Sequence, residues 1–244
     1  MPRTKGRFLI IGLDCATPQL ILDSPAGDDL KNLRALMGRG SYGRLTSTIP
    51  AITCPAWMCM ATSKDPGTLG LYGFRNRKDY SYTGLSIGTS LAVKEPTVWD
   101  ILGREGLKSL IMAVPMTFPP KPLNGWLCTG FLAPDTSSDF CYPRSFREEL
   151  LSVAPDYQVD VRGFRTENKR ELLQQIYDMT AEHFKAIRHM MKTKDWDFMK
   201  FVEMGPDRLY HAFWRYCSPD HRLYEPGGEF ETAIADYHRY LDEE

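Results

Sequence analysis

Apolar residues alternate along the chain between short continuous runs and longer stretches with helical spacing. The continuous runs predict strands buried in a parallel sheet, at 8–13, 109–114, 125–131 and 196–203. Apolar positions three or four residues apart predict helices at 29–39, 97–105, 170–192 and 234–241. Strands that alternate with helices in this way are typical of an α/β fold with a mostly parallel central sheet flanked by helices.

The segments between these elements carry weaker signals. A further strand is expected at 43–48, and a helix is expected to begin at Thr53 because Pro55 suits a first helical turn. The residues Asp65-Pro-Gly67 predict a turn. The stretch 67–88 is rich in glycine and tyrosine and is expected to be a loop.

Polar residues fall where a parallel α/β sheet gathers its functional groups, beyond the carboxyl ends of the strands. Asp14 directly follows the first predicted strand, and Asp207 and His211 follow the strand at 196–203. Burying a carboxylate costs free energy unless a partner such as a metal ion compensates. For Asp14 the alternative is a helix N-cap or a turn residue.

Asp207 and His211 are four residues apart. If a helix begins near Asp207, both side chains project from one face of it and can bind one metal ion. The alternative is an aspartate that caps the helix and an unrelated histidine.

Thr53 precedes the predicted helix, so its hydroxyl is either a cap or a nucleophile. A threonine hydroxyl is a poor nucleophile at neutral pH and needs a base or a metal ion to remove its proton. No local Ser-His-Asp signature is present, which favours a metal ion.

Composition narrows the function classes. The chain has 244 residues, of which 43% are hydrophobic and 25% charged, and a net charge of −1. Nothing in this balance indicates a nucleic-acid polymer or a membrane surface as a partner. The six cysteines form no CxxC pair and are expected to be reduced thiols. No signal peptide or membrane span is recognisable, so we expect a soluble, cytoplasmic protein.

Several segments together resemble one known family. The resemblance is to the type I phosphodiesterase/nucleotide pyrophosphatase branch of the alkaline phosphatase superfamily. The most specific segment surrounds Thr53 and reads Ser-Thr-Ile-Pro-Ala-Ile-Thr-Cys-Pro-Ala-Trp. The segments that carry the resemblance are 10–14, 36–45, 47–57, 66–74 and 201–211.

The resemblance implies an alkaline-phosphatase-like fold and a site with two divalent metal ions, expected to be zinc, with manganese as the alternative. It assigns Asp14 and Thr53 to one metal ion, and Asp207 and His211 to the other. It makes Thr53 the nucleophile, which forms a covalent intermediate with the substrate. Asn76 matches an asparagine that contacts the phosphate. The implied substrate is a small-molecule phosphoester or a nucleotide, and the oligomeric state is not indicated.

Two features of the family's metal site have no counterpart in this chain. The family carries a further Asp-His pair on a later strand and a final histidine downstream. Asp220-His221 lies too close to His211 to be that pair, and His183 and His189 are expected to be solvated or at the edge of the core. We therefore expect residues 1–244 to form a single catalytic domain that is truncated at its C-terminus and binds metal weakly on its own.

Three alternatives remain. A sulfatase is disfavoured because Trp57 stands where the sulfatase pattern has arginine. A phosphomutase of the same superfamily generally carries a serine nucleophile and a large inserted domain, and neither is visible. The third alternative is a non-catalytic fold remnant that acts as a binding or scaffold module. Retention of the four candidate residues argues against it.

Overall fold

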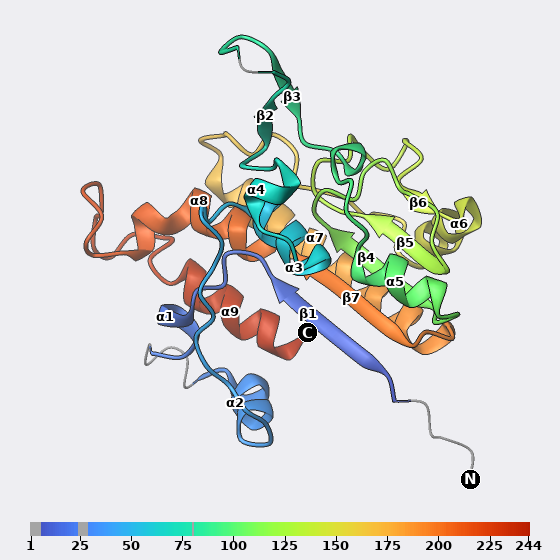
Figure 1. Cartoon of the computed structure of the whole chain (residues 1–244). Coiled ribbons are helices and arrows are strands. Elements are labelled where there is room, and N and C mark those ends of the chain that lie inside the picture. Colours follow the sequence, from blue (N-terminus) through green and yellow to red (C-terminus); the bar gives the residue numbers. More distant parts are fainter. Residues whose placement is uncertain (1–5, 24–28, 80) are drawn as a thin grey trace. The chain divides into compact units, whose positions relative to one another are not determined.

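The computed structural model describes residues 6–23, 29–79 and 81–244 (Figure 1). The chain divides into two compact units. Unit 1 contains Met1–Gly12, Thr46–Asp160 and Lys185–Val202. Unit 2 contains Leu13–Leu45, Val161–Phe184 and Glu203–Glu244.

A five-stranded sheet has the strand order β1-β7-β4-β5-β6 (Figure 1). β4 is parallel to both β5 and β7, and β5 is antiparallel to β6. The predicted mostly parallel sheet is therefore confirmed. The strands are β1 (Phe8–Leu13), β4 (Ser109–Val114), β5 (Gly125–Thr129), β6 (Cys141–Tyr142) and β7 (Phe198–Glu203).

The first strand differs from expectation, because β1 is an edge strand and not a buried one. Its residues Phe8 and Ile11 are 63% and 53% exposed. By contrast, every residue of β4 and β7 is buried. A continuous apolar run predicts burial on both faces, but only the position in the sheet decides whether neighbours cover them.

One face of this sheet is covered by α3 (Thr53–Thr62), which begins at the predicted residue. Cys54 and Met58 of this helix belong to a buried cluster with residues of β4 and β7. Gly12 permits close contact, because a Cβ atom there would lie 2.5 Å from the Trp57 ring. The helix that carries Thr53 is thus held firmly against the sheet.

The other elements of unit 1 include two corrections to the sequence predictions. The expected turn after Asp65 is a short helix, for which the Asp65 side chain accepts the N–H of Thr68 at 2.8 Å. The expected loop at 67–88 contains an antiparallel hairpin. The elements are α4 (Pro66–Leu69), β2 (Arg75–Arg77), β3 (Leu85–Ile87), η2 (Ser90–Ala92), α5 (Val98–Arg104) and α6 (Arg144–Val153).

Unit 2 is helical. Its two C-terminal helices pack on each other, and the later one also packs on α2. The predicted helices at 29–39, 170–192 and 234–241 are confirmed with small shifts at their ends. The elements are α1 (Pro18–Ile21), α2 (Lys31–Met37), α7 (Lys169–Thr193, which continues into unit 1), α8 (Gly205–Cys217) and α9 (Ala233–Glu243).

The strand expected at 43–48 is not formed, and these residues are irregular. Leu45 is 88% exposed, so its side chain does not pack against a sheet. All six cysteines are free thiols. Within the described residues, no helix combines the length and apolar composition needed to cross a membrane.

Candidate functional site

Asp14 follows β1 and is brought to the end of β7 by a backbone hydrogen bond. Its N–H donates to the carbonyl oxygen of Glu203 at 3.0 Å. Asp14 is 6% exposed, and burying its carboxylate costs free energy unless a partner compensates. The next residue, Cys15, has a φ of 62°, and this left-handed turn directs the chain away from the strand.

α8 begins directly after β7 and carries Asp207 in its first turn. Pro206 is favourable at this place, because the first N–H groups of a helix have no acceptor within the helix and proline carries no N–H. A carboxylate in the first turn is stabilised by the positive end of the helix dipole. Asp207 is 4% exposed and forms a 2.8 Å ion pair with Arg208.

His211 lies one turn further along the same face of α8. Its Nε2 atom is 3.4 Å from Oδ1 of Asp207. The two side chains differ in exposure, 66% for His211 and 6% for Asp207. The pair therefore places an accessible imidazole nitrogen beside a buried carboxylate oxygen.

The carboxylates of Asp14 and Asp207 converge with the thiol of Cys15. One ligand atom from each of the three residues lies within 4.8 Å of the others. The Cys15 thiol donates to Oδ1 of Asp207 at 3.0 Å. Burial and this bond to a carboxylate raise the pKa of the Cys15 thiol. Two carboxylates and a sulfur at this separation are a donor set that fits a divalent cation.

Three neighbours of this cluster were not singled out by the sequence. Cys15 and Arg208 directly follow the two aspartates, so adjacency was the available signal. Phe164 lies 43 residues before Asp207 in the chain, and no sequence pattern indicated that it would lie near this cluster. Its ring contacts the Arg208 guanidinium at 5.1 Å and the His211 ring edge-on at 6.5 Å.

Thr53 belongs to unit 1, whereas Asp14, Asp207 and His211 belong to unit 2. Thr53 is the first residue of α3, and the N-cap is Ile52, without any side-chain cap hydrogen bond. The capping alternative for Thr53 is therefore not realised. Its hydroxyl lies at the positive end of the helix dipole, where an anionic group is favoured.

Asn76 lies on β2 in unit 1, and its side-chain amide bonds to the preceding loop. Its Oδ1 atom accepts the N–H of Tyr72 at 2.8 Å, and its Nδ2 atom donates to the carbonyl oxygen of Gly73 at 3.1 Å. These bonds shape the turn before the hairpin. An amide nitrogen carries two hydrogens, so one further donor is left by these two bonds.

The expectation for His183 is wrong, because this histidine is 2% exposed. Its Nδ1 atom lies 2.9 Å from Oε2 of Glu203. His189 is partly exposed, as expected, and lies 3.4 Å from Glu149. The His183 side chain was misjudged because an imidazole on a long helix is buried only where another element supplies a partner.

The structure is similar to two crystal structures of phosphonoacetate hydrolase from Sinorhizobium meliloti 1021. The complex with phosphonoformate aligns at 17% sequence identity and a TM-score of 0.58, covering 98% of this chain and 53% of that chain. The complex with phosphonoacetate aligns at 15% identity and a TM-score of 0.57, with the same coverage of 98% and 53%. This chain thus spans about half the length of those chains, and at this identity the likeness concerns the fold. No curated protein matches the chain.

The fold match agrees with the predicted alkaline-phosphatase-like arrangement, a mostly parallel sheet with flanking helices. A family model matches residues 8–244, a range that includes every candidate site residue. The chain belongs to the type I phosphodiesterase/nucleotide pyrophosphatase family.

Proposed function

We propose that the whole protein is a metal-dependent phosphoester hydrolase of the phosphodiesterase type. The observation that carries the proposal is the convergence of two buried carboxylates, Asp14 and Asp207, beside the accessible imidazole of His211. Family membership supplies the reaction class, since this chain matches the family model over residues 8–244. A small-molecule phosphoester or a nucleotide is the proposed substrate.

The proposed cofactors are two divalent cations, zinc or manganese. We assign Asp14 and Thr53 to one of them, and Asp207 and His211 to the other. When bound, such cations supply positive charge that stabilises the attacking and leaving oxygens of an in-line displacement. Arg208, paired with Asp207 at 2.8 Å, holds that carboxylate in one orientation.

The proposed nucleophile is Thr53 at the start of α3. Its oxygen forms a bond to phosphorus, the bond from phosphorus to the leaving oxygen breaks, and the proton of the hydroxyl ends on that oxygen, so that an alcohol leaves. Water then hydrolyses the ester between threonine and the phosphoryl group, which releases the phosphate monoester and regenerates the hydroxyl. The positive end of the α3 dipole favours the negative charge of the phosphoryl group. The second N–H of the Asn76 amide is the proposed donor to a non-bridging oxygen.

The test measures hydrolysis of bis-p-nitrophenyl phosphate and p-nitrophenyl phosphate by the whole protein with Zn²⁺ or Mn²⁺. We expect the diester to be preferred, and a Thr53→Ala variant to lose at least about a hundredfold in kcat. Thr53→Ser keeps a hydroxyl and should retain part of the rate. Thr193→Ala, at the exposed end of α7, is the matched control.

Two results would decide against this proposal. Equal rates for the wild type and Thr53→Ala would remove Thr53 as the nucleophile. Binding of phosphate esters without any turnover would instead support a non-catalytic binding module. Phosphonoacetate belongs in the substrate panel, because a protein of similar fold was solved with it bound.

A further inference from the structure

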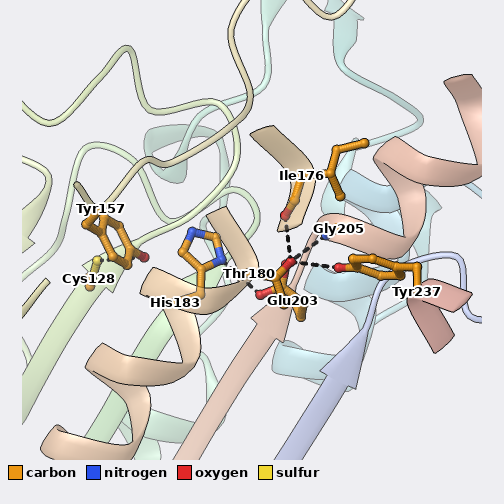
Figure 2. Close-up of polar contacts among 8 residues, drawn as sticks. All are labelled: Cys128, Tyr157, Ile176, Thr180, His183, Glu203, Gly205 and Tyr237. Atoms are coloured by element: carbon orange, nitrogen blue, oxygen red, sulfur yellow. Dashed lines mark hydrogen bonds and ion pairs between the residues drawn. The ribbon is translucent and has the colours of Figure 1, made fainter. Parts of the chain in front are cut away.

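The carboxylate of Glu203 lies at the centre of a buried polar network in unit 2 (Figure 2). Glu203 is 0% exposed, and its Oε2 atom lies 2.9 Å from Nδ1 of His183. Its Oε1 atom accepts the N–H of Gly205 at 2.9 Å and lies 3.2 Å from the Thr180 hydroxyl. These contacts compensate the free energy that burying a carboxylate costs.

The same residue contacts both segments that carry the aspartates of the candidate site. Its backbone oxygen accepts the N–H of Asp14 at 3.0 Å. Its side chain accepts the N–H of Gly205, two residues before Asp207. Glu203 therefore joins the end of β1 to the start of α8 through two hydrogen bonds of different origin, one from its main chain and one from its side chain.

The Glu203 side chain takes the place of a helix cap for α8. The N-cap residue, Met204, makes no side-chain cap hydrogen bond. The first N–H groups of a helix have no acceptor within the helix, so an acceptor from outside fixes how the helix starts. A carboxylate there is also favoured by the helix dipole. Since Asp207 lies in this first turn, its position depends on the same bond.

Thr180 contacts the Glu203 carboxylate, and Tyr237 in turn contacts Thr180. The Thr180 hydroxyl lies 3.0 Å from the carbonyl oxygen of Ile176 and 2.7 Å from the Tyr237 hydroxyl, so it ties the network to α7 and α9. Burial and the Glu203 charge raise the pKa of Tyr237 well above its ordinary value. Tyr237 therefore remains a hydrogen-bond donor.

A purely structural ion pair is the competing explanation. A buried ion pair often adds little to the free energy of unfolding, because apolar residues of similar volume can stabilise the protein equally well. An apolar side chain, however, cannot accept the N–H of Gly205. The bond to Gly205 therefore indicates that this carboxylate serves to fix the start of α8.

We propose that Glu203 is a positioning residue that holds the carboxylates of Asp14 and Asp207 at the separation that the two neighbouring cations need. The proposal deepens the proposed function and rests on it for the identity of the site. The feature that matters is the reach of the side chain to Gly205, and not its charge.

The experiment compares Glu203→Gln with Glu203→Asp in the full chain. Glutamine preserves the length of the side chain and offers its carbonyl oxygen to Gly205 and its amide to His183. Aspartate preserves the charge but is one methylene shorter. The matched controls are Glu149→Gln and Glu149→Asp, since Glu149 is a half-buried carboxylate of unit 1 that contacts His189 at 3.4 Å.

Two readouts are used, hydrogen exchange at the amides of Asp14 and Gly205, and Co²⁺ affinity with its visible spectrum. For Glu203→Asp we expect exchange to be at least about tenfold faster at Gly205, whose bond is to the side chain, and faster to a smaller degree at Asp14, whose bond is to the main chain. Co²⁺ affinity should be about 10–100-fold lower. Glu203→Gln should stay within about threefold of the wild type. The Glu149 variants should change neither readout.

Wild-type exchange and Co²⁺ affinity in Glu203→Asp would overturn the proposal, and so would an equal loss in both Glu203 variants. The exchange measurement needs neither metal nor substrate. If the wild type binds no Co²⁺, the proposed metal site is wrong, and the exchange rates still decide whether Glu203 holds the two segments.

Discussion

The imidazole of His211 lies 3.4 Å from the carboxylate of Asp207, one helical turn away on α8. This spacing places an accessible nitrogen donor beside a buried oxygen donor. Such a pair can bind one cation without any rearrangement of the helix.

Asp207→Asn should therefore lower the Zn²⁺ affinity of the chain. Removing a residue that only supports a ligand costs roughly 10–100-fold in metal affinity, so loss of the ligand itself should cost at least about tenfold. Isothermal titration with Zn²⁺ measures the change. Asp220→Asn, on an exposed turn, is the control and should bind as the wild type does. Unchanged affinity in Asp207→Asn would exclude this carboxylate as a ligand.

Lys200 should make the stability of the protein depend on pH. This lysine is 1% exposed on β7, its Nζ atom has no hydrogen-bond partner among the described residues, and it lies 5.2 Å from the Trp57 ring. Burial lowers the pKa of Lys200 to about 8. The unfolded value is about 10.4, so between these values the unfolded chain binds more protons and stability rises with pH. Below about pH 8 the protein bears the full cost of the buried charge.

Replacing Lys200 by Met should raise the free energy of unfolding by up to about 3 kcal/mol at pH 7, and the gain should shrink towards zero near pH 10. Urea denaturation of both proteins at pH 7 and pH 9.5 measures the difference. A less stable Lys200→Met protein at pH 7 would show instead that the ammonium contact with the Trp57 ring outweighs desolvation.

Gly205→Ala should destabilise unit 2. A Cβ atom at this position would lie 1.8 Å from the Tyr237 hydroxyl and 2.9 Å from Oε1 of Glu203. Overpacking of this kind typically costs about 1–3 kcal/mol. Tyr237→Phe removes the nearest atom, so the double variant should lose less than the sum of the two single losses. Thermal unfolding of the four proteins gives the coupling, and strict additivity would argue that the alanine is accommodated by a backbone shift.

Asp242 should be needed for the start of α2. Its two carboxylate oxygens accept the N–H groups of Asn32 at 2.8 Å and Leu33 at 2.7 Å, while the N-cap residue Leu30 provides no side-chain acceptor. Losing a cap typically costs about 0.5–2 kcal/mol. Asp242→Ala should therefore speed hydrogen exchange at the amides of α2, and Asp242→Asn should do so less. Unaltered exchange in α2 would contradict this role.

The sequence by itself determined most elements and their order. The strand at 109–114 was predicted with its observed ends, and the helix at 170–192 agrees to within one residue at each end. These elements were predictable because a continuous apolar run and helical spacing reflect local geometry, which the chain carries in its own residue order. Family resemblance also placed Asp14, Asp207 and His211 among the candidate residues, although spacing alone left each of them ambiguous.

Tertiary structure decided what lies against each residue. Whether β1 is central or at an edge, and whether Lys200 is buried, depends on strand order and not on the run of residues. The partners of His183 and of the α2 terminus, Glu203 and Asp242, are 20 and 210 residues away in the chain. Burial and hydrogen bonding are properties of neighbours in space, and a carboxylate becomes a ligand, a cap or a positioning residue only when folding brings its partner within reach.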